Sequence, residues 1–138
     1  MNVDHIGIVV KSLAEGIEHW KKIFGYEQAT EIIPNTKQKV NLVFLSKENS
    51  ITVKLMEPTD STSPVYALAK RGGGLHHLCF KCDSVGKETE RLHSLGLRTL
   101  VKPEPGDAVE NEDIAFVYAK QGITIELIDT DKKSKRIK

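Results

Sequence analysis

The feature that most constrains the fold of this chain is an internal repeat with a period of 72 residues. When the second half of the sequence is laid on the first without a gap, matching residues coincide at equivalent points: His5 with His77, Ser12 with Ser84, Phe44 with Phe116, and ITVKL (51–55) with ITIEL (123–127). Apolar positions in the two halves follow the same register. Such a match indicates a tandem duplication of one structural module.

The first half has the pattern of a strand, a helix and three further strands. The β-branched run Val3–Val10 predicts a strand, and Ser12 with Glu15 forms a capping box that starts a helix. Apolar residues recur at helical spacing from Leu13 onward, and Gly25 ends this pattern. Further strands are expected at 26–33, 39–46 and 51–57, with a turn at 49–50.

The second half repeats this order. A strand is expected at 75–82, and Ser84 caps a helix that ends at Gly96. The apolar face of this helix is predicted to comprise Val85, Thr89, Leu92 and Leu95. Strands follow near 97–102, 113–119 and 122–128, and 103–107 is expected to be a loop. Between the halves, the sequence predicts a short helix over 63–71 with Pro64 at its first position.

These patterns predict an α+β fold of two tandem βαβββ modules. Module one spans 1–58, a linker spans 59–74 and module two spans 75–131, which together form one domain, 1–131. Five basic residues fall within 132–138. We expect this basic tail to be solvated, and the alternative is a tail that binds an anion.

Composition excludes several classes of protein. The net charge of +1 gives no field that would attract nucleic acid. No apolar run approaches the roughly 20 residues of a membrane span, and the N-terminus lacks the apolar core of a signal peptide. Two cysteines do not make a disulfide framework. We therefore expect a cytoplasmic protein without nucleic acid or membrane partners.

Strand alternation places four polar residues on the face away from the helices. His5 and His77 are repeat partners on the first strands of the two modules, and Lys54 and Glu126 are partners on the last strands. Two imidazoles and a carboxylate that converge from His5, His77 and Glu126 would suit Zn, Co, Mn, Ni or Fe(II). Three protein ligands would leave positions open for water or substrate. The sequence therefore predicts a site for one divalent metal ion.

The segments DHIGIVV (4–10), VKLMEP (53–58), SPVYALAKRGGGLHHLCF (63–80) and GITIELID (122–129) resemble the vicinal oxygen chelate superfamily, which includes glyoxalase I, methylmalonyl-CoA epimerase and extradiol dioxygenases. The segment 63–80 is most similar to methylmalonyl-CoA epimerases. The resemblance implies a half-open mixed barrel around a divalent ion, with ligands at His5, His77 and Glu126. It also implies a homodimer and a small-molecule substrate such as an acyl-CoA or a 2-oxo or hydroxy acid derivative.

Lys54 departs from this family pattern, in which a Glu or Gln would be a fourth ligand. A protonated ammonium cannot bind a cation and is repelled by one. Three outcomes are open: Lys54 turns away and leaves a three-ligand site, it loses its proton and acts as a base or ligand, or metal binding is weak or absent. A second departure is the short turn at 119–122, which counts against acyl-CoA recognition.

The remaining candidates are secondary. Lys54 and Cys79 are expected to line the substrate pocket. Cys79 and Cys82 form a CxxC pattern, but alternation places them on opposite strand faces, which argues against a shared metal or redox pair. His76 is expected to face away from the metal.

The first functional hypothesis is a metal-dependent isomerase, epimerase or lyase that abstracts a proton α to a carbonyl through a metal-stabilised enolate. In this hypothesis Glu126 is the catalytic carboxylate, and a metal-bound water is the alternative base. A non-enzymatic drug- or metabolite-binding protein of the same fold is the second hypothesis. An Fe(II) dioxygenase, which also uses two histidines and one carboxylate, is the third.

Overall fold

The computed structural model of this chain describes residues 1–137. Its elements are β1 (Asn2–Val9), α1 (Leu13–Phe24), β2 (Glu27–Gln28), β3 (Ile33–Asn35), β4 (Val40–Ser46), β5 (Thr52–Pro58), α2 (Tyr66–Lys70), β6 (Gly74–Lys81), α3 (Val85–Ser94), β7 (Arg98–Pro105), the 3-10 helix η1 (Asp107–Val109), β8 (Asp113–Ala119) and β9 (Ile123–Ile128). Lys138 of the basic tail lies outside the described residues.

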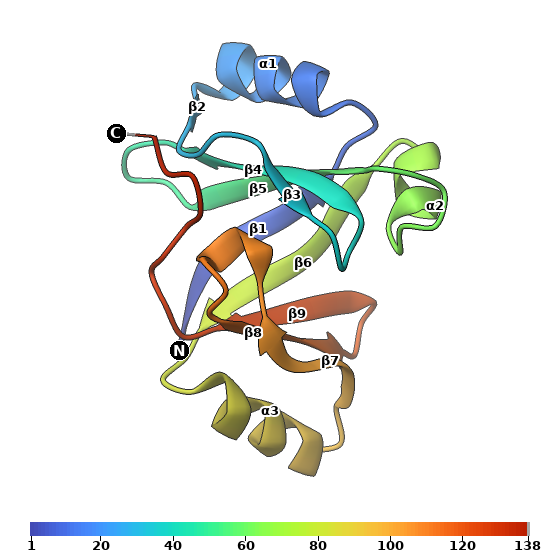
Figure 1. The fold of residues 1–138 in the computed structure, drawn as a ribbon, viewed down its shortest axis with the longest axis vertical. Coiled ribbons are helices and arrows are strands. Elements are labelled where there is room, and N and C mark those ends of the chain that lie inside the picture. Colours follow the sequence, from blue (N-terminus) through green and yellow to red (C-terminus); the bar gives the residue numbers. More distant parts are fainter. Residues whose placement is uncertain (138) are drawn as a thin grey trace.

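The two halves meet at the centre of one continuous sheet. The strand order is β2-β4-β5-β1-β6-β9-β8-β7, and β3 pairs with β4. β1 pairs in parallel with β5, and β6 pairs in parallel with β9. β1 and β6 are antiparallel neighbours, so the inner strands of the two modules lie side by side (Figure 1). The predicted α+β fold is confirmed, and β1 and β6 are separated by the 72 residues of the repeat.

Each long helix covers the outer face of its own module, and α1 and α3 lie at opposite ends of the molecule (Figure 1). α1 begins at Ser12, whose hydroxyl accepts a hydrogen bond from the Glu15 backbone N–H, and α3 begins at Ser84 in the same way. Gly25 ends α1 with a φ of 73°, a left-handed conformation that favours glycine. Leu13 of α1 packs in one cluster with Leu55 of β5, and Val85 of α3 packs in another with Leu127 of β9. These helices therefore leave the opposite face of the sheet uncovered. This concave inner face of the half-open barrel is called the cup.

The structure corrects several predicted boundaries. The strand expected at 26–33 is divided into β2 and β3, because the segment between them turns toward the end of the chain: the N–H of Glu31 donates to the carbonyl of Lys135, and that of Ile137 to Ala29. The helix expected over 63–71 is only α2, since Pro64 lies in a turn before it. Leu95 is not on the buried face of α3 but is 64% exposed at its C-terminal end.

The expected loop at 103–107 is also wrong. β7 continues to Pro105 and pairs with β8, with two register shifts along the way. Two prolines are tolerated there because β7 is an edge strand, where one row of backbone groups needs no sheet partner. η1 follows directly and contacts module one: Asp107 accepts a hydrogen bond from the N–H of Thr36, the residue after β3.

The basic tail is exposed along most of its length, as expected, but it is not a free segment. From the end of β9 the chain runs back along the side of the molecule toward β2 (Figure 1). We call residues 132–137 the strap. The backbone N–H of Ser134 donates to Ala108, its hydroxyl donates to the Asp107 carbonyl, and Arg136 forms a bridge with Thr30. The strap therefore joins η1 of module two to module one.

Across residues 1–137, no helix combines the length and the apolar character needed to cross a membrane.

Candidate metal centre

Three side chains predicted as ligands converge on one point in the cup. His5 on β1 and His77 on β6 each place Nε2 3.1 Å from Oε1 of Glu126 on β9. The two Nε2 atoms are 3.4 Å apart. All three residues are at most 4% exposed. These residues come from three strands, and the central pairing of β1 with β6 brings the repeat partners together.

The spacing of these three atoms suits a single metal ion. In a tetrahedral zinc site with bonds of about 2.0–2.1 Å, neighbouring ligand atoms lie about 3.3 Å apart. The atoms of His5, His77 and Glu126 form a triangle with sides of 3.1, 3.1 and 3.4 Å. The donor set of this chain therefore fits a divalent ion by geometry as well as by chemistry.

Two β-bulges give each histidine a second partner. The register between β1 and β6 shifts between Val3 and His5, and again between Gly7 and Ile8. The extra residue of the first bulge is Asp4 on β1, and that of the second is His76 on β6. A bulge interrupts strand alternation and can re-aim a side chain. Both extra residues consequently contact the histidine that follows them.

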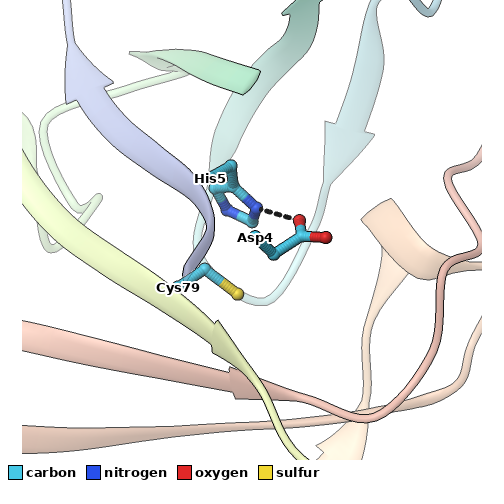
Figure 2. A group of neighbouring side chains, drawn as sticks. All are labelled: Asp4, His5 and Cys79. Carbon is cyan, nitrogen blue, oxygen red and sulfur yellow. Dashed lines mark hydrogen bonds and ion pairs between the residues drawn. The ribbon is translucent and has the colours of Figure 1, made fainter. Parts of the chain in front are cut away.

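Asp4 and His76 bind the outer nitrogens of the two histidines. Nδ1 of His5 is 2.7 Å from Oδ2 of Asp4, as Figure 2 shows. Nδ1 of His77 is 2.8 Å from Nδ1 of His76. Partners of this kind fix the ring orientation of metal-binding histidines. The prediction that His76 faces away is therefore wrong, and the bulge is the physical reason.

The two nitrogens of His5 face two carboxylates, Asp4 and Glu126. A neutral imidazole carries one N–H. If that N–H is at Nδ1 and donates to Asp4, the Nε2 lone pair faces the Glu126 oxygen with no proton between them. In that tautomer the two atoms are able to bind a cation together.

Lys54 does not turn away from this cluster. Its side chain is buried, and Nζ lies 3.5 Å from Oε1 of Glu126, the same oxygen that both histidines contact. Nζ also lies 5.9 Å from the centre of the Phe44 ring. Of the three outcomes open from the sequence, the first, in which Lys54 turns away from the site, is therefore wrong.

The electrostatic environment keeps the acids ionised and His77 neutral. Burial alone would raise the pKa of Glu126, but Lys54 and the hydrogen bonds of His5 and His77 hold it well below its usual value. Burial lowers the pKa of His77 to about 3 against the opposing effect of Glu126. Burial would likewise raise the pKa of Asp4, but the hydrogen bond with His5 and the charge of Lys133 bring it below its usual value. At neutral pH the cluster therefore holds two carboxylates.

Hydrophobic side chains and the strap enclose the cluster. Phe44 packs edge-on against His5, and Phe116 packs edge-on against His77. Lys133 of the strap places Nζ 3.1 Å from Asp4 and 5.3 Å from the centre of the Phe44 ring. These contacts leave His5, His77 and Glu126 almost fully buried.

The two cysteines are free, and only Cys79 belongs to the site. Its thiol lies beside Asp4 and His5 (Figure 2) and is fully buried, whereas Cys82 packs under α3. Burial raises the pKa of Cys79. Our sequence reasoning missed Asp4 and His76 as contacts of the histidines. The 72-residue shift aligns these two residues with each other and was the signal that could have found them.

Comparison with known proteins agrees with this geometry. A family model described as "Glyoxalase/Bleomycin resistance protein/Dioxygenase superfamily" matches residues 4–116. The chain is 29% identical over 134 residues to the uncharacterized protein YqjC of Bacillus subtilis, covering 92% of this chain and 91% of the relative. It is 26% identical over 129 residues to mitochondrial methylmalonyl-CoA epimerase of Dictyostelium discoideum, covering 91% and 76%.

Solved structures give the same result. Methylmalonyl-CoA epimerase from Mycobacterium tuberculosis superposes with a TM-score of 0.81 at 30% identity, covering 92% of this chain and 86% of that one. A variant of Streptomyces coelicolor methylmalonyl-CoA epimerase in complex with 2-nitronate-propionyl-CoA superposes with a TM-score of 0.83 at 28% identity, covering 95% and 98%. The family expected from the sequence is thus confirmed: the chain belongs to the glyoxalase/bleomycin resistance protein/dioxygenase superfamily.

Proposed function

We propose that this protein is an epimerase-type enzyme that removes and returns a proton at the carbon α to the carbonyl of a malonyl-type acyl-CoA. The observation that carries the proposal is the convergence of His5, His77 and Glu126 on one buried point. Similarity to proteins named methylmalonyl-CoA epimerase supports the substrate class. The structure with 2-nitronate-propionyl-CoA supports an acyl-CoA partner.

In this proposal His5, His77 and Glu126 would hold one divalent ion. When bound, it would supply positive charge to an oxygen of the substrate that becomes negative as the α-proton leaves. Asp4 and His76 fix the two imidazoles through their outer nitrogens, so that both Nε2 atoms point inward. The phenyl rings of Phe44 and Phe116 exclude water around them, which strengthens charge interactions at the site.

Glu126 is the proposed catalytic carboxylate. It is ionised at neutral pH, because its pKa lies well below its usual value. Oε1 is the atom that contacts Lys54 and both histidines. Oε2 takes part in none of the hydrogen bonds or ion pairs found within residues 1–137, which leaves it able to accept the substrate proton.

Proton exchange in deuterated water tests this proposal. Methylmalonyl-CoA incubated with the protein and added Co(II), Zn(II) or Mn(II) should gain deuterium at the α-carbon, as measured by mass spectrometry. His77→Gln should reduce the exchange rate by at least about 100-fold, a typical effect of losing an acid–base or electrostatic group. His93→Gln, at an exposed position on α3, is the matched control. Equal exchange in His77→Gln and the unmodified protein would refute the proposal.

A non-enzymatic binding protein is the second candidate, and the ammonium of Lys54 at the Glu126 carboxylate favours it. This candidate predicts saturable binding of methylmalonyl-CoA or a drug-like ligand by calorimetry, with no deuterium uptake under any added metal. Deuterium uptake that is lost in His77→Gln would exclude it.

The homodimer, the lyase alternative and the cytoplasmic location remain predictions. Light scattering of the purified chain measures its mass directly, and a value near twice 15.4 kDa would support the homodimer.

A further inference from the structure

Lys54 occupies an unusual position for a buried lysine. It is 3% exposed, and its ammonium lies 3.5 Å from one carboxylate oxygen that two imidazoles already contact. Lys54 and Glu126 are 72 residues apart and are therefore repeat partners on β5 and β9. The duplicated fold thus places a cation and an anion at equivalent points of the two modules.

The charges of the cluster balance without any added ion. Lys54 faces Glu126, and Lys133 of the strap faces Asp4, so two cationic and two anionic side chains form two pairs. A buried carboxylate needs such a partner, because an unpaired charge in a hydrophobic environment is costly. A divalent ion bound by His5, His77 and Glu126 would lie beside the Lys54 ammonium and would be repelled by it.

We propose that Lys54 is the resident cation of this site and lowers its affinity for divalent ions. The Lys54 ammonium holds Glu126 in the metal-free protein, and a divalent ion that binds the three donors has to displace it from the carboxylate. This inference concerns cation binding alone and does not depend on which reaction the protein performs.

Cobalt titration of substituted proteins tests this role. Lys54→Gln removes the charge but keeps a polar side chain, and Lys54→Met removes the charge without adding a good ligand. Both variants should bind Co(II) at least about 100-fold more tightly than the unmodified protein, since each removes a like charge next to the ion. Calorimetry gives the affinity, and the visible absorption of Co(II) reports coordination by protein ligands.

Two controls connect the effect to the site. Lys81→Gln removes a positive charge from a partly exposed position on β6 and should leave Co(II) affinity unchanged. Adding His77→Gln to Lys54→Gln should abolish the gained affinity, because it removes one of the three donors. If only Lys54→Gln gains affinity while Lys54→Met does not, a new amide ligand explains the result and the charge role is wrong.

Thermal unfolding provides a second readout, in which each variant is compared with itself in the absence and presence of metal. Without metal, Lys54→Gln and Lys54→Met should unfold at lower temperature than the unmodified protein, because Glu126 loses its charged partner. Saturating Co(II) should raise the unfolding temperature of both variants, since a ligand that binds the folded state stabilises it. The unmodified protein should show little shift at the same concentration.

The unmodified protein is sufficient to overturn the proposal. Submicromolar binding of one Co(II) per chain, with Lys54 in place, would show that the ammonium does not limit affinity. This result is distinct from failure of the proposed epimerase, because it is measured without substrate.

Discussion

At the scale of single residues, the site consists of two matching pairs. Asp4 precedes His5 and His76 precedes His77, and the 72-residue repeat relates one pair to the other. In both pairs the first residue contacts Nδ1 of the second, so that Nε2 points toward Glu126. The pairs differ in charge, because only Asp4 brings a carboxylate. His5 is therefore the histidine whose outer nitrogen contacts a charged group.

Replacing Asp4 with Asn should destabilise the protein measurably. The substitution removes the charged partner of Lys133, whose side chain is only 8% exposed, and weakens the contact with His5. Hydrogen bonds to charged groups contribute about 1.5–3 kcal/mol, so we expect the free energy of unfolding to fall by about 2 kcal/mol. Urea unfolding with chelator present measures it. Asp131→Asn, at a side chain that is 82% exposed, should change little. Equal stability of the two variants would contradict the prediction.

Gly7 is required because of how closely β1 approaches His77. The two residues are register partners across β1 and β6, and a Cβ atom at Gly7 would overlap the His77 imidazole. Gly7→Ala should therefore displace the ring, abolish proton exchange and lower stability by about 1–3 kcal/mol, as expected for overpacking. Activity and urea unfolding check both effects.

Gly86→Ala is the matched control for Gly7→Ala. A Cβ at this position in α3 meets no atom within 4 Å, and alanine favours helix by up to about 1 kcal/mol. It should keep its activity and unfold at an equal or higher urea concentration. Retained activity in Gly7→Ala would show that His77 does not need its observed position.

At the scale of elements, the strap and η1 act together as a cover over the cup. Ser134 holds η1 through the carbonyls of Asp107 and Ala108. Val109 of η1 then packs in the same cluster as Cys79 and Phe116. The burial of Cys79 therefore depends on residues far away in the sequence, and its thiol is a natural reporter of this cover.

Deleting residues 132–138 should make Cys79 reactive. In the intact chain, Cys79 is fully buried with a raised pKa, so it should resist alkylation by iodoacetamide at pH 8. Without the strap, η1 loses its contacts with Ser134, and alkylation should become faster by at least about 10-fold, because the thiolate is the reacting form and access limits it. Mass spectrometry in a Cys82→Ser background reports Cys79 alone. An unchanged rate in the truncated chain would show that η1 stays closed by itself.

At the scale of the whole molecule, the buried cluster makes stability depend on pH. His77 has a pKa of about 3 in the folded protein and an ordinary value of 6.5. Between these values the unfolded chain binds a proton that the folded chain does not, so stability falls as the pH is lowered. Asp4 and Glu126, whose pKa values are below their ordinary ones, add to the loss below about pH 4.5.

The slope of this pH dependence is measurable. With chelator present, His77 should contribute a loss of about 1.4 kcal/mol per pH unit in the free energy of unfolding between about pH 6 and 4. Urea unfolding over a pH series gives the slope. His77→Gln should lower this slope by about 1.4 kcal/mol per pH unit, which is the contribution of one proton. The same slope in both proteins would contradict the pKa assigned to His77.

Much of this protein follows from its sequence. The 72-residue repeat, the Ser12 and Ser84 caps and the alternation of the strands predict the fold and the convergence of His5, His77 and Glu126. These features depend on local periodicity and on a symmetry that is visible in the chain itself.

Tertiary structure alone decides which residues contact the outer nitrogens of His5 and His77. It also decides the place of Lys54 and the course of the strap. The bulges that turn Asp4 and His76 toward the site arise from the register between β1 and β6, strands that are 72 residues apart. Sequence alternation cannot include an extra residue whose position is set by a distant partner strand. The ion pairs Lys54–Glu126 and Lys133–Asp4 depend on tertiary structure for the same reason. Each pair joins residues far apart in the sequence, which only the fold brings together out of water.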